Sequence, residues 1–304
     1  MIPLFTSIPP RTIRTTSDGS DIGDEYASMC VRSWRSSGFD PVTVNSHNEA
    51  IADVVHEENV RSIRIDRDAQ KDYGKPLVFF SDFLKAACAG CEGPIAITNA
   101  DIVLDVPGDV YDRISSLPQG KSLVAKRLDV DDFGSSAGSE YRHGYDLFVF
   151  HTADLRKFSF EGFVFGMPWW DHVLPIDMYL NGIEALPSDL PIAFHLKHSE
   201  RWDFERWVTL GRHFLKSVRR RLDSGAYSPE RALGYGSDLS QARAGPDVDV
   251  LERLTRPLRR LSRSYRVQDE IEMLTRVADL NVAWLDHIRT ASTGALQAGS
   301  HGSS

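Results

Sequence analysis

Apolar residues follow two different patterns along the first two hundred positions. Short, nearly continuous apolar runs predict buried strands, whereas apolar residues recurring every three or four positions predict amphipathic helices. The predicted strands are 2–7, 41–45, 61–65, 93–102, 122–126, 147–150 and 190–194, and the predicted helices are 25–36, 48–57, 81–89 and one beginning near 170. This alternation predicts an α/β fold with a mostly parallel sheet flanked by helices on both faces.

The pattern changes after Arg201 to long amphipathic stretches without strands. Helices are predicted at 204–222 and 248–263, separated by a segment rich in Gly, Ser and Pro. We therefore predict a helical C-terminal extension. The expected domains are an α/β domain at 1–204, a helical subdomain at 205–290 and a flexible tail at 291–304.

Charge is distributed unevenly along the 304 residues, whose formal net charge is −8. From Glu205 to Ser304 there are 16 Lys and Arg against 12 Asp and Glu, so this part carries +4 and the preceding part −12. An acidic domain is a poor binder of nucleic acid, and it needs a cation to hold an anionic ligand. No apolar run is long enough for a bilayer, and the N-terminus does not resemble a signal peptide, which predicts a cytoplasmic protein.

Two polar side chains follow the apolar run that ends at Thr98. Asn99 and Asp101 are two positions apart, so on an extended segment they share one face and present oxygen atoms to the same point. Oxygen ligands suit a hard divalent cation. The alternative is a turn in which these side chains bond to backbone donors.

With this motif in place, the chain resembles a GT-A-type nucleotide-sugar glycosyltransferase, in which Asn99-Ala100-Asp101 stands where the family has Asp-x-Asp. The resemblance covers about residues 2–204. Its pieces, in order, are 5–11, 33–34 leading to 44–46, 74–76, 97–101, 166–171 and 195–198. It implies a GT-A-like fold and an enzyme that moves a sugar from a nucleotide diphosphate donor to an acceptor hydroxyl. The implied cofactor is Mn²⁺ or Mg²⁺, and inversion is the favoured outcome.

The resemblance also assigns residues to the donor. The first loop, with Ser7, Pro9 and Arg11, and the region of Asn45 are implied to contact the nucleotide, and Asn99 and Asp101 to reach the metal, the ribose or the diphosphate. Because Asn99 replaces an acidic residue, metal binding is expected to depend mainly on Asp101, to be weaker than usual, or to be absent. Since phosphate oxygens favour cationic donors, the candidates for neutralising the diphosphate are Lys75, Lys126 and Arg127.

His195 and His198 follow a predicted strand, where a neutral imidazole can complete the coordination of Mn²⁺ or a similar cation. The segment resembles the late metal-binding histidine of many GT-A enzymes. The sequence does not separate the two histidines, and surface histidines without a ligand are the alternative.

Trp169, Trp170 and Asp171 stand together near the start of a predicted helix. Indole rings pack against the apolar faces of sugars, so either tryptophan is a candidate wall of a substrate pocket, with a place in the core as the alternative. Asp171 resembles the carboxylate that removes the acceptor proton in inverting enzymes, with Glu161 and Asp146 as rivals. Capping of the helix is the simpler role for Asp171.

The expected partners are a nucleotide sugar and a carbohydrate or glycolipid acceptor, as in polysaccharide or glycolipid assembly. Two basic segments, 216–222 and 256–263, are candidates for peripheral contact with the inner face of a membrane. A solvated helix face and a contact between copies of the chain are the alternatives. The alternative functions are a nucleotidyltransferase, which calls for a Gly-rich loop that the N-terminus lacks, and a non-catalytic nucleotide- or carbohydrate-binding protein.

Overall fold

The computed structural model describes residues 1–223, except 17–18, 134–137, 142, 159, 187–189 and 199–202, together with 274–275, 277–279 and 282–283. The chain divides into two compact units. The first comprises Met1–Tyr141, Tyr145–Met167 and Ser188–Glu200, and the second comprises Arg142–Gly144, Pro168–Pro187 and Arg201–Ser304. The predicted domain limits at 204 and 290 stay predictions.

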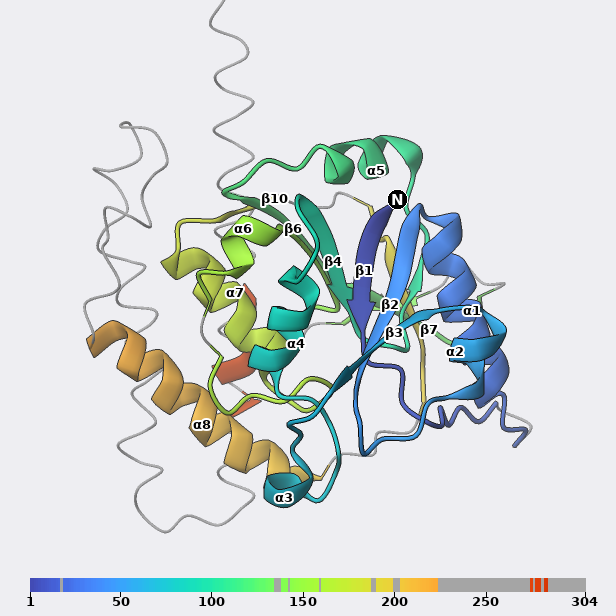
Figure 1. The fold of residues 1–304 in the computed structure, drawn as a ribbon, viewed down its shortest axis with the longest axis horizontal. Coiled ribbons are helices and arrows are strands. Elements are labelled where there is room, and N and C mark those ends of the chain that lie inside the picture. Colours follow the sequence, from blue (N-terminus) through green and yellow to red (C-terminus); the bar gives the residue numbers. More distant parts are fainter. Residues whose placement is uncertain are drawn as a thin grey trace, which may run out of the picture. The chain divides into compact units, whose positions relative to one another are not determined.

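A mostly parallel sheet is the centre of the first unit and confirms the predicted α/β class. Its strands are β1 (Ile2–Thr6), β2 (Phe39–Ser46), β3 (Arg61–Ile65), β4 (Pro94–Thr98), β6 (Lys121–Ala125) and β9 (Leu147–His151). They lie in the order β6-β9-β4-β1-β2-β3, and Figure 1 shows β4, β1 and β2 side by side. The strands β4, β1, β2 and β3 are parallel, whereas β9 runs antiparallel to both of its neighbours β4 and β6.

A second, smaller sheet contributes to the candidate site. It consists of β5 (Val103–Leu104), β11 (Ala193–Leu196), β7 (Arg127–Val130) and β8 (Gly138–Glu140), in that order. Strand β5 begins two residues after Asp101, and β11 pairs with β5 through Phe194 and Val103. Because β11 also runs parallel to β7, with His195 opposite Asp129, residues far apart in sequence meet beside the turn after β4.

The helices of the first unit are α1 (Gly23–Ser36), α2 (Asp53–Glu57), α3 (Gln70–Tyr73), α4 (Phe80–Cys88), α5 (Gly108–Ser115) and α6 (Thr152–Leu155). Helix α1 buries residues at helical spacing and packs on β2 and β5. Its Trp34 is fully buried and donates from Nε1 to the carbonyl of Ile102 at 2.7 Å. Burial of such a side chain contributes about 3 kcal/mol, so α1 fixes the segment that carries Asp101.

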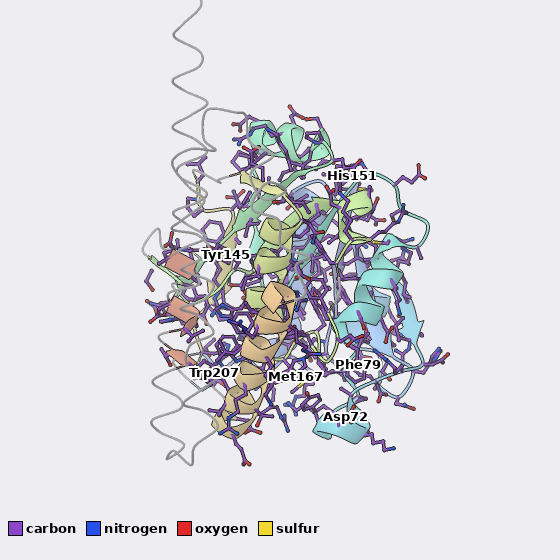
Figure 2. All side chains as sticks on the ribbon, turned by 90° about the vertical axis from the view of Figure 1, so that its left-hand side faces the viewer. Asp72, Phe79, Tyr145, His151, Met167 and Trp207 are labelled. Carbon is purple, nitrogen blue, oxygen red and sulfur yellow. The ribbon has the colours of Figure 1, made fainter. Side chains whose placement is uncertain are left out.

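Helix α4 and the neighbouring loop are held by aromatic contacts. The rings of Phe83 and Phe165 stack with centroids 4.1 Å apart, and the ring of Phe80 lies 4.8 Å from that of Phe160. At the start of α6, Nδ1 of His151, which is labelled in Figure 2, accepts a hydrogen bond from the backbone of the second residue of the helix. These contacts close the first unit around an apolar core.

The second unit contains α7 (Trp170–Leu180), β10 (Glu184–Leu186) and α8 (Phe204–Asp223) among its described residues. Helices α7 and α8 are in contact. Arg221 on α8 bonds to both carboxylate oxygens of Asp177 on α7, at 3.0 Å for Nη2 and Oδ2. One residue of the basic segment 216–222 is thus engaged within the unit.

Most elements predicted on the described residues are present, although some differ in their limits or direction. The helix predicted at 48–57 begins only at Asp53, because 47–52 form a turn and an extended segment. The strand predicted at 147–150 is antiparallel to its neighbours. The helix predicted at 248–263 and the tail at 291–304 lie outside the described residues. Across the described part of the chain, no helix is both long and apolar enough to cross a bilayer.

Candidate functional site

The turn after β4 positions the two polar residues of the Asn99-Ala100-Asp101 motif. The apolar strand ends at Thr98, whose hydroxyl donates to the carbonyl of Asp146 at 2.7 Å. Nδ2 of Asn99 donates to Oδ1 of Asp146 at 2.7 Å. The hydroxyl of Tyr26 donates to the backbone carbonyl of Asp101 at 2.7 Å. The side chain of Asp101 is one third exposed, and its carboxylate faces His195 on β11. The place of Asn99 among metal ligands stays a prediction.

His195 is buried at the C-terminal half of β11, and its ring is oriented by a carboxylate. Its Nδ1 lies 2.9 Å from Oδ1 of Asp129. An ionised carboxylate only accepts, so in the neutral ring that metal binding requires Nδ1 carries the proton toward Asp129, and Nε2, with its lone pair, faces Oδ2 of Asp101, 3.4 Å away. A histidine that binds metal is typically held by a carboxylate in this way. Burial alone would lower the pKa of His195, but the hydrogen bonds to Asp101 and Asp129 raise it.

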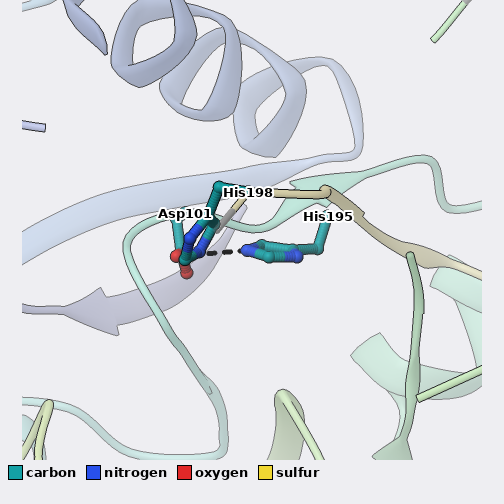
Figure 3. Close-up of side chains that lie close together, drawn as sticks. All are labelled: Asp101, His195 and His198. Atoms are coloured by element: carbon teal, nitrogen blue, oxygen red, sulfur yellow. Dashed lines mark ion pairs between the residues drawn. The ribbon is translucent and has the colours of Figure 1, made fainter. Parts of the chain in front are cut away.

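Asp101, His195 and His198 form the candidate metal centre, which Figure 3 shows. Each offers one ligand atom, and these atoms lie within 4.8 Å of one another. The rings of His195 and His198 are 5.1 Å apart, and His198 is exposed. One carboxylate and two imidazoles are a donor set for Mn²⁺ or a later transition metal rather than for Mg²⁺, which prefers oxygen ligands. Of the two cations that the resemblance implies, the donor set suits Mn²⁺ better than Mg²⁺, and which cation binds stays a prediction.

A buried chain of charged groups connects the motif to β7. Nε of Arg127 donates to Oδ1 of Asp129 at 2.8 Å, and Nη1 lies 3.3 Å from Oδ1 of Asp146. Burial alone would lower the pKa of Arg127, but the carboxylates of Asp146 and Asp129 outweigh it and raise the pKa. Burial would raise the pKa of Asp101, whereas the hydrogen bond from His195 and its charge hold it well below its usual range.

Two candidates of the sequence are engaged in these contacts. Asp146, a rival for the general base, is 3% exposed and accepts from Asn99 and Arg127, and its role as a base stays a prediction. Arg127 is committed to the same carboxylates. Nζ of Lys126 lies 3.3 Å from a carboxylate oxygen of Glu140. A contact of Arg127 or Lys126 with a diphosphate stays a prediction.

The loop after β1 is built on Asn45, which the sequence assigns to the nucleotide. Asn45 is fully buried, and its Nδ2 donates to the carbonyl of Ile8 at 2.9 Å and to Oε2 of Glu49 at 2.8 Å. Its Oδ1 accepts from the hydroxyl of Thr43 at 2.6 Å. The polar atoms of this side chain hold the loop, and a contact of the Asn45 region with a nucleotide stays a prediction.

The other residues assigned to the donor lie at the surface of the first unit. Ser7 and Pro9 are half-buried, whereas Arg11 and Lys75 are exposed. Nη2 of Arg11 pairs with Oδ2 of Asp21 at 3.1 Å. Their contact with a nucleotide stays a prediction.

Glu161, the other rival base, is exposed and lines a different hollow. That pocket, of about 770 Å³, shares no lining residue with the candidate metal centre. Its wall combines aromatic rings with the basic residues Arg67, Lys85 and Arg156. Glu161 thus has a place in a pocket, but nothing in that pocket connects it to the candidate metal.

The predicted sugar-binding tryptophans are buried in the structure. Trp169 is 1% exposed, its Nε1 donates to the carbonyl of Trp207 at 3.0 Å, and its ring stacks on Phe214. Trp170 is 2% exposed. Both side chains are buried, as in the core alternative that the sequence left open, and a contact of either ring with a substrate stays a prediction. Asp171 lies in the first turn of α7 in the second unit, and its role as general base stays a prediction.

Sequence reasoning missed three residues that shape the site: Arg14, Tyr26 and Asp129. Arg14 lies in a loop without periodic pattern, and its guanidinium is brought to Asp101 by tertiary contacts alone. Tyr26 follows the apolar period of α1 and is indistinguishable from a core residue by pattern. Asp129 follows the predicted strand 122–126, and its only signal was a carboxylate two positions from Arg127, a spacing at which the two side chains share one face of an extended segment.

Comparisons with known proteins describe a distant likeness. No protein-family model matches the sequence, and no curated protein matches it either. Among solved structures, a nucleotidyl transferase from Methanothermobacter thermautotroptrophicus is similar, with 15% identity and a TM-score of 0.40 over 71% of this chain and 99% of that chain. HddC from Yersinia pseudotuberculosis complexed with GMP-PN has 13% identity and a TM-score of 0.35 over 66% and 91%.

An inositol-1-phosphate CTP transferase from T. maritima has 11% identity and a TM-score of 0.34, covering 64% of this chain and 84% of that chain. Two of these three proteins are named as a nucleotidyl transferase and a CTP transferase, which is the class of activity given above as the alternative to glycosyl transfer. Such identities and TM-scores leave the activity of this chain to be argued from its own residues.

Proposed function

We propose that the first unit is a nucleotide-dependent transferase that holds a divalent cation with Asp101, His195 and His198 against the diphosphate of its substrate. The main support for this proposal is that these three ligand atoms lie within 4.8 Å of one another, beyond the end of β4 and at the end of β11. Ligands of open α/β sheets bind at the carboxyl ends of the strands. When bound, such a cation offsets the charge that develops on the departing phosphate oxygens.

Glycosyl transfer is the reaction that we favour within this class. The loop after β1 reads Ser7-Ile8-Pro9-Pro10-Arg11. Since proline has no backbone N–H, the two prolines leave this loop short of the consecutive donors that cradle a nucleoside triphosphate. A nucleoside diphosphate that leaves from a sugar makes a smaller demand on the loop, because a cation at Asp101 supplies much of the countercharge.

The residues then divide the work as follows. Asp101 and the two histidines hold the cation, Asp129 orients His195, and Arg127 fixes Asp129 and Asp146. Arg11 and Lys75 remain candidates for the nucleotide and the diphosphate. Asp171 remains the proposed base for direct displacement with inversion, and the acceptor is proposed to be a carbohydrate or a glycolipid.

Nucleotidyl transfer is the second candidate, because it is the activity named for the proteins of similar structure. The two reactions release different products. A glycosyltransferase releases a nucleoside diphosphate from a nucleotide sugar, whereas a nucleotidyltransferase releases pyrophosphate from a nucleoside triphosphate and a sugar phosphate. The product therefore decides between them.

The test is to incubate the purified protein and Mn²⁺ with a panel of nucleoside diphosphate sugars, and separately with nucleoside triphosphates and sugar 1-phosphates. Nucleoside diphosphate and pyrophosphate are quantified by mass spectrometry. Asp101→Asn is expected to reduce the release at least about 100-fold. Asp105→Asn, which removes the same charge from an exposed position four residues away, is expected to behave as wild type.

Calorimetry of nucleoside diphosphates with and without Mn²⁺ supplies a second measurement. Binding that is strengthened by Mn²⁺ and lost in Asp101→Asn supports the proposal. Binding without turnover of any donor identifies a non-catalytic binding protein, and the absence of any nucleotide binding refutes the proposed function.

A further inference from the structure

A buried arginine lies between the ligands of the candidate metal centre. The side chain of Arg14 is 7% exposed, and its Nη2 lies 2.6 Å from Oδ2 of Asp101. The same nitrogen is 3.1 Å from Nε2 of His195. These two acceptor atoms are the ones that a cation bound by both residues would use, and they are 3.4 Å apart.

Several contacts hold Arg14 in this position. Nη1 donates to the carbonyl of Ile13 at 3.2 Å, and the guanidinium carbon lies 5.0 Å from the centre of the Tyr26 ring. The backbone N–H of Arg14 donates to Oδ1 of Asp21 at 3.2 Å, and its carbonyl accepts from Ile22 at 2.8 Å. The guanidinium is therefore part of a built arrangement rather than a long side chain lying on a surface.

The start of α1 closes the loop that carries Arg14. Oδ1 of Asp21 also accepts from the backbone of Gly23 at 3.1 Å. A Cβ at position 23 would lie 1.9 Å from the carbonyl oxygen of Thr12, so only glycine allows the two ends of the loop to approach this closely. The loop thereby holds Arg14 toward Asp101.

One donor of this buried guanidinium is left without a partner. Nε of Arg14 is buried and has no hydrogen-bond acceptor among the described residues. A buried donor without an acceptor is costly. The present location therefore satisfies the charge of Arg14 through Asp101 but not all of its hydrogen bonds, which makes displacement from this location feasible.

We propose that Arg14 is a built-in cation that occupies the metal position of the nucleotide-free protein, and that a divalent metal binds Asp101 and His195 only by displacing it. This role of Arg14 depends on the proposed function, since it requires a metal held by Asp101 and His195. A metal bonded to both ligands lies about 2.1 Å from each of them, in the space where Nη2 lies. Two cations cannot share this space, so Arg14 and the metal are alternative occupants.

The consequence is that Arg14 weakens metal binding in the absence of nucleotide. Removing its charge frees Asp101 and Nε2 of His195 for the metal. Arg14→Met keeps much of the apolar stem, so we expect it to bind Mn²⁺ at least about tenfold more tightly than wild type. Arg32→Met is the matched control, because it removes the same charge from an exposed residue of α1 that pairs with Glu58.

The experiment is calorimetric titration of each nucleotide-free protein with Mn²⁺. Tighter binding in Arg14→Met than in wild type and Arg32→Met, abolished when His195→Ala is added, supports the proposal. Equal or weaker binding in Arg14→Met overturns it. If Arg14→Met binds Mn²⁺ no more tightly but the wild-type protein shows activity in the product assay above, the role of Arg14 is refuted and the proposed function stands. If no protein binds Mn²⁺ and no nucleotide is turned over, the proposed function fails with it.

A measurement on the wild-type protein covers the case in which Arg14→Met does not fold. Phenylglyoxal modifies accessible guanidinium groups, and peptide mapping reports the rate at each arginine. Saturating Mn²⁺ is expected to accelerate modification of Arg14 several-fold and to leave Arg32 unchanged. A rate at Arg14 that is unaltered or slowed by Mn²⁺ contradicts displacement.

Discussion

Replacing Asp129 with asparagine is expected to weaken Mn²⁺ binding by about 10- to 100-fold, although Asp129 is not itself a proposed ligand. The carboxylate accepts the proton on Nδ1 of His195 at 2.9 Å, which leaves Nε2 to face Asp101. An asparagine amide can present its own N–H to Nδ1. The ring then carries its proton on Nε2 and has no lone pair for a metal.

The expected magnitude follows from the burial of this pair. The side chain of His195 is 5% exposed and that of Asp129 is 19% exposed, so solvent screens their interaction only weakly. A 10- to 100-fold change corresponds to about 1.4 to 2.7 kcal/mol, which is within the range of a hydrogen bond to a charged group. Arg127 keeps Asp146 as a partner, so the neighbouring strand should stay in place.

The assay is titration with Mn²⁺ above neutral pH, where protons compete least with the metal for Nε2 of His195. Asp131→Asn serves as control, because it removes the same charge two residues away from a carboxylate that is 77% exposed and pairs with Lys197. Unchanged affinity in Asp129→Asn, or an equal loss in Asp131→Asn, would show that His195 is not oriented in the way described.

Three further substitutions test the structure. Trp169→Phe removes the Nε1–H bonded to the carbonyl of Trp207, so chemical denaturation should show a loss of about 1–3 kcal/mol with transfer intact; lost transfer at unchanged stability would restore a substrate role. Burial lowers the pKa of His172 to about 4 from 6.5, so its neutral ring stabilises the fold fully above pH 6.5 and this stability is lost toward pH 4. The free energy of unfolding of the wild type should therefore fall by about 3 kcal/mol between pH 6.5 and pH 4, and His172→Gln should reduce this fall in denaturation measured at several pH values. An unchanged dependence on pH would show that His172 is not the group responsible. Gly23→Ala places a Cβ 1.9 Å from the carbonyl oxygen of Thr12, so the free energy of unfolding should fall by about 2 kcal/mol. An unaltered melting temperature would show that the loop can move to accommodate the methyl group.

Local pattern was sufficient to predict the elements that carry the motif. The apolar run before Asn99 forms β4, and the helical spacing of 25–36 forms most of α1, because both elements bury one continuous set of side chains. The direction of β9 could not be predicted in the same way. Its residues are buried and apolar in either orientation, and only pairing with β4 and β6 fixes it as antiparallel.

The candidate site could be predicted only in part, since residues distant in sequence meet in it. Asp101 and His195 were both identified from strand ends, but their proximity depends on the pairing of β11 with β5 and β7. Asn45 is a different case: the resemblance assigned its region to the nucleotide, and only the structure shows that its side chain holds the loop after β1. Trp169 was equally ambiguous, because a buried indole and a sugar-facing indole look the same in a sequence.

The hydroxyl of Tyr26 donates to the carbonyl of Asp101 at 2.7 Å and accepts from the backbone of Leu196 at 3.1 Å. One phenol thus joins the turn after β4 to the strand that carries His195. The conformational entropy of these two segments is lost when the protein folds, and not when a ligand binds. A ligand that bridges Asp101 and His195 therefore binds two segments that are already held together. In Tyr26→Phe both hydrogen bonds are lost, so part of the binding free energy would be used to order these segments, and the ligand would bind less tightly.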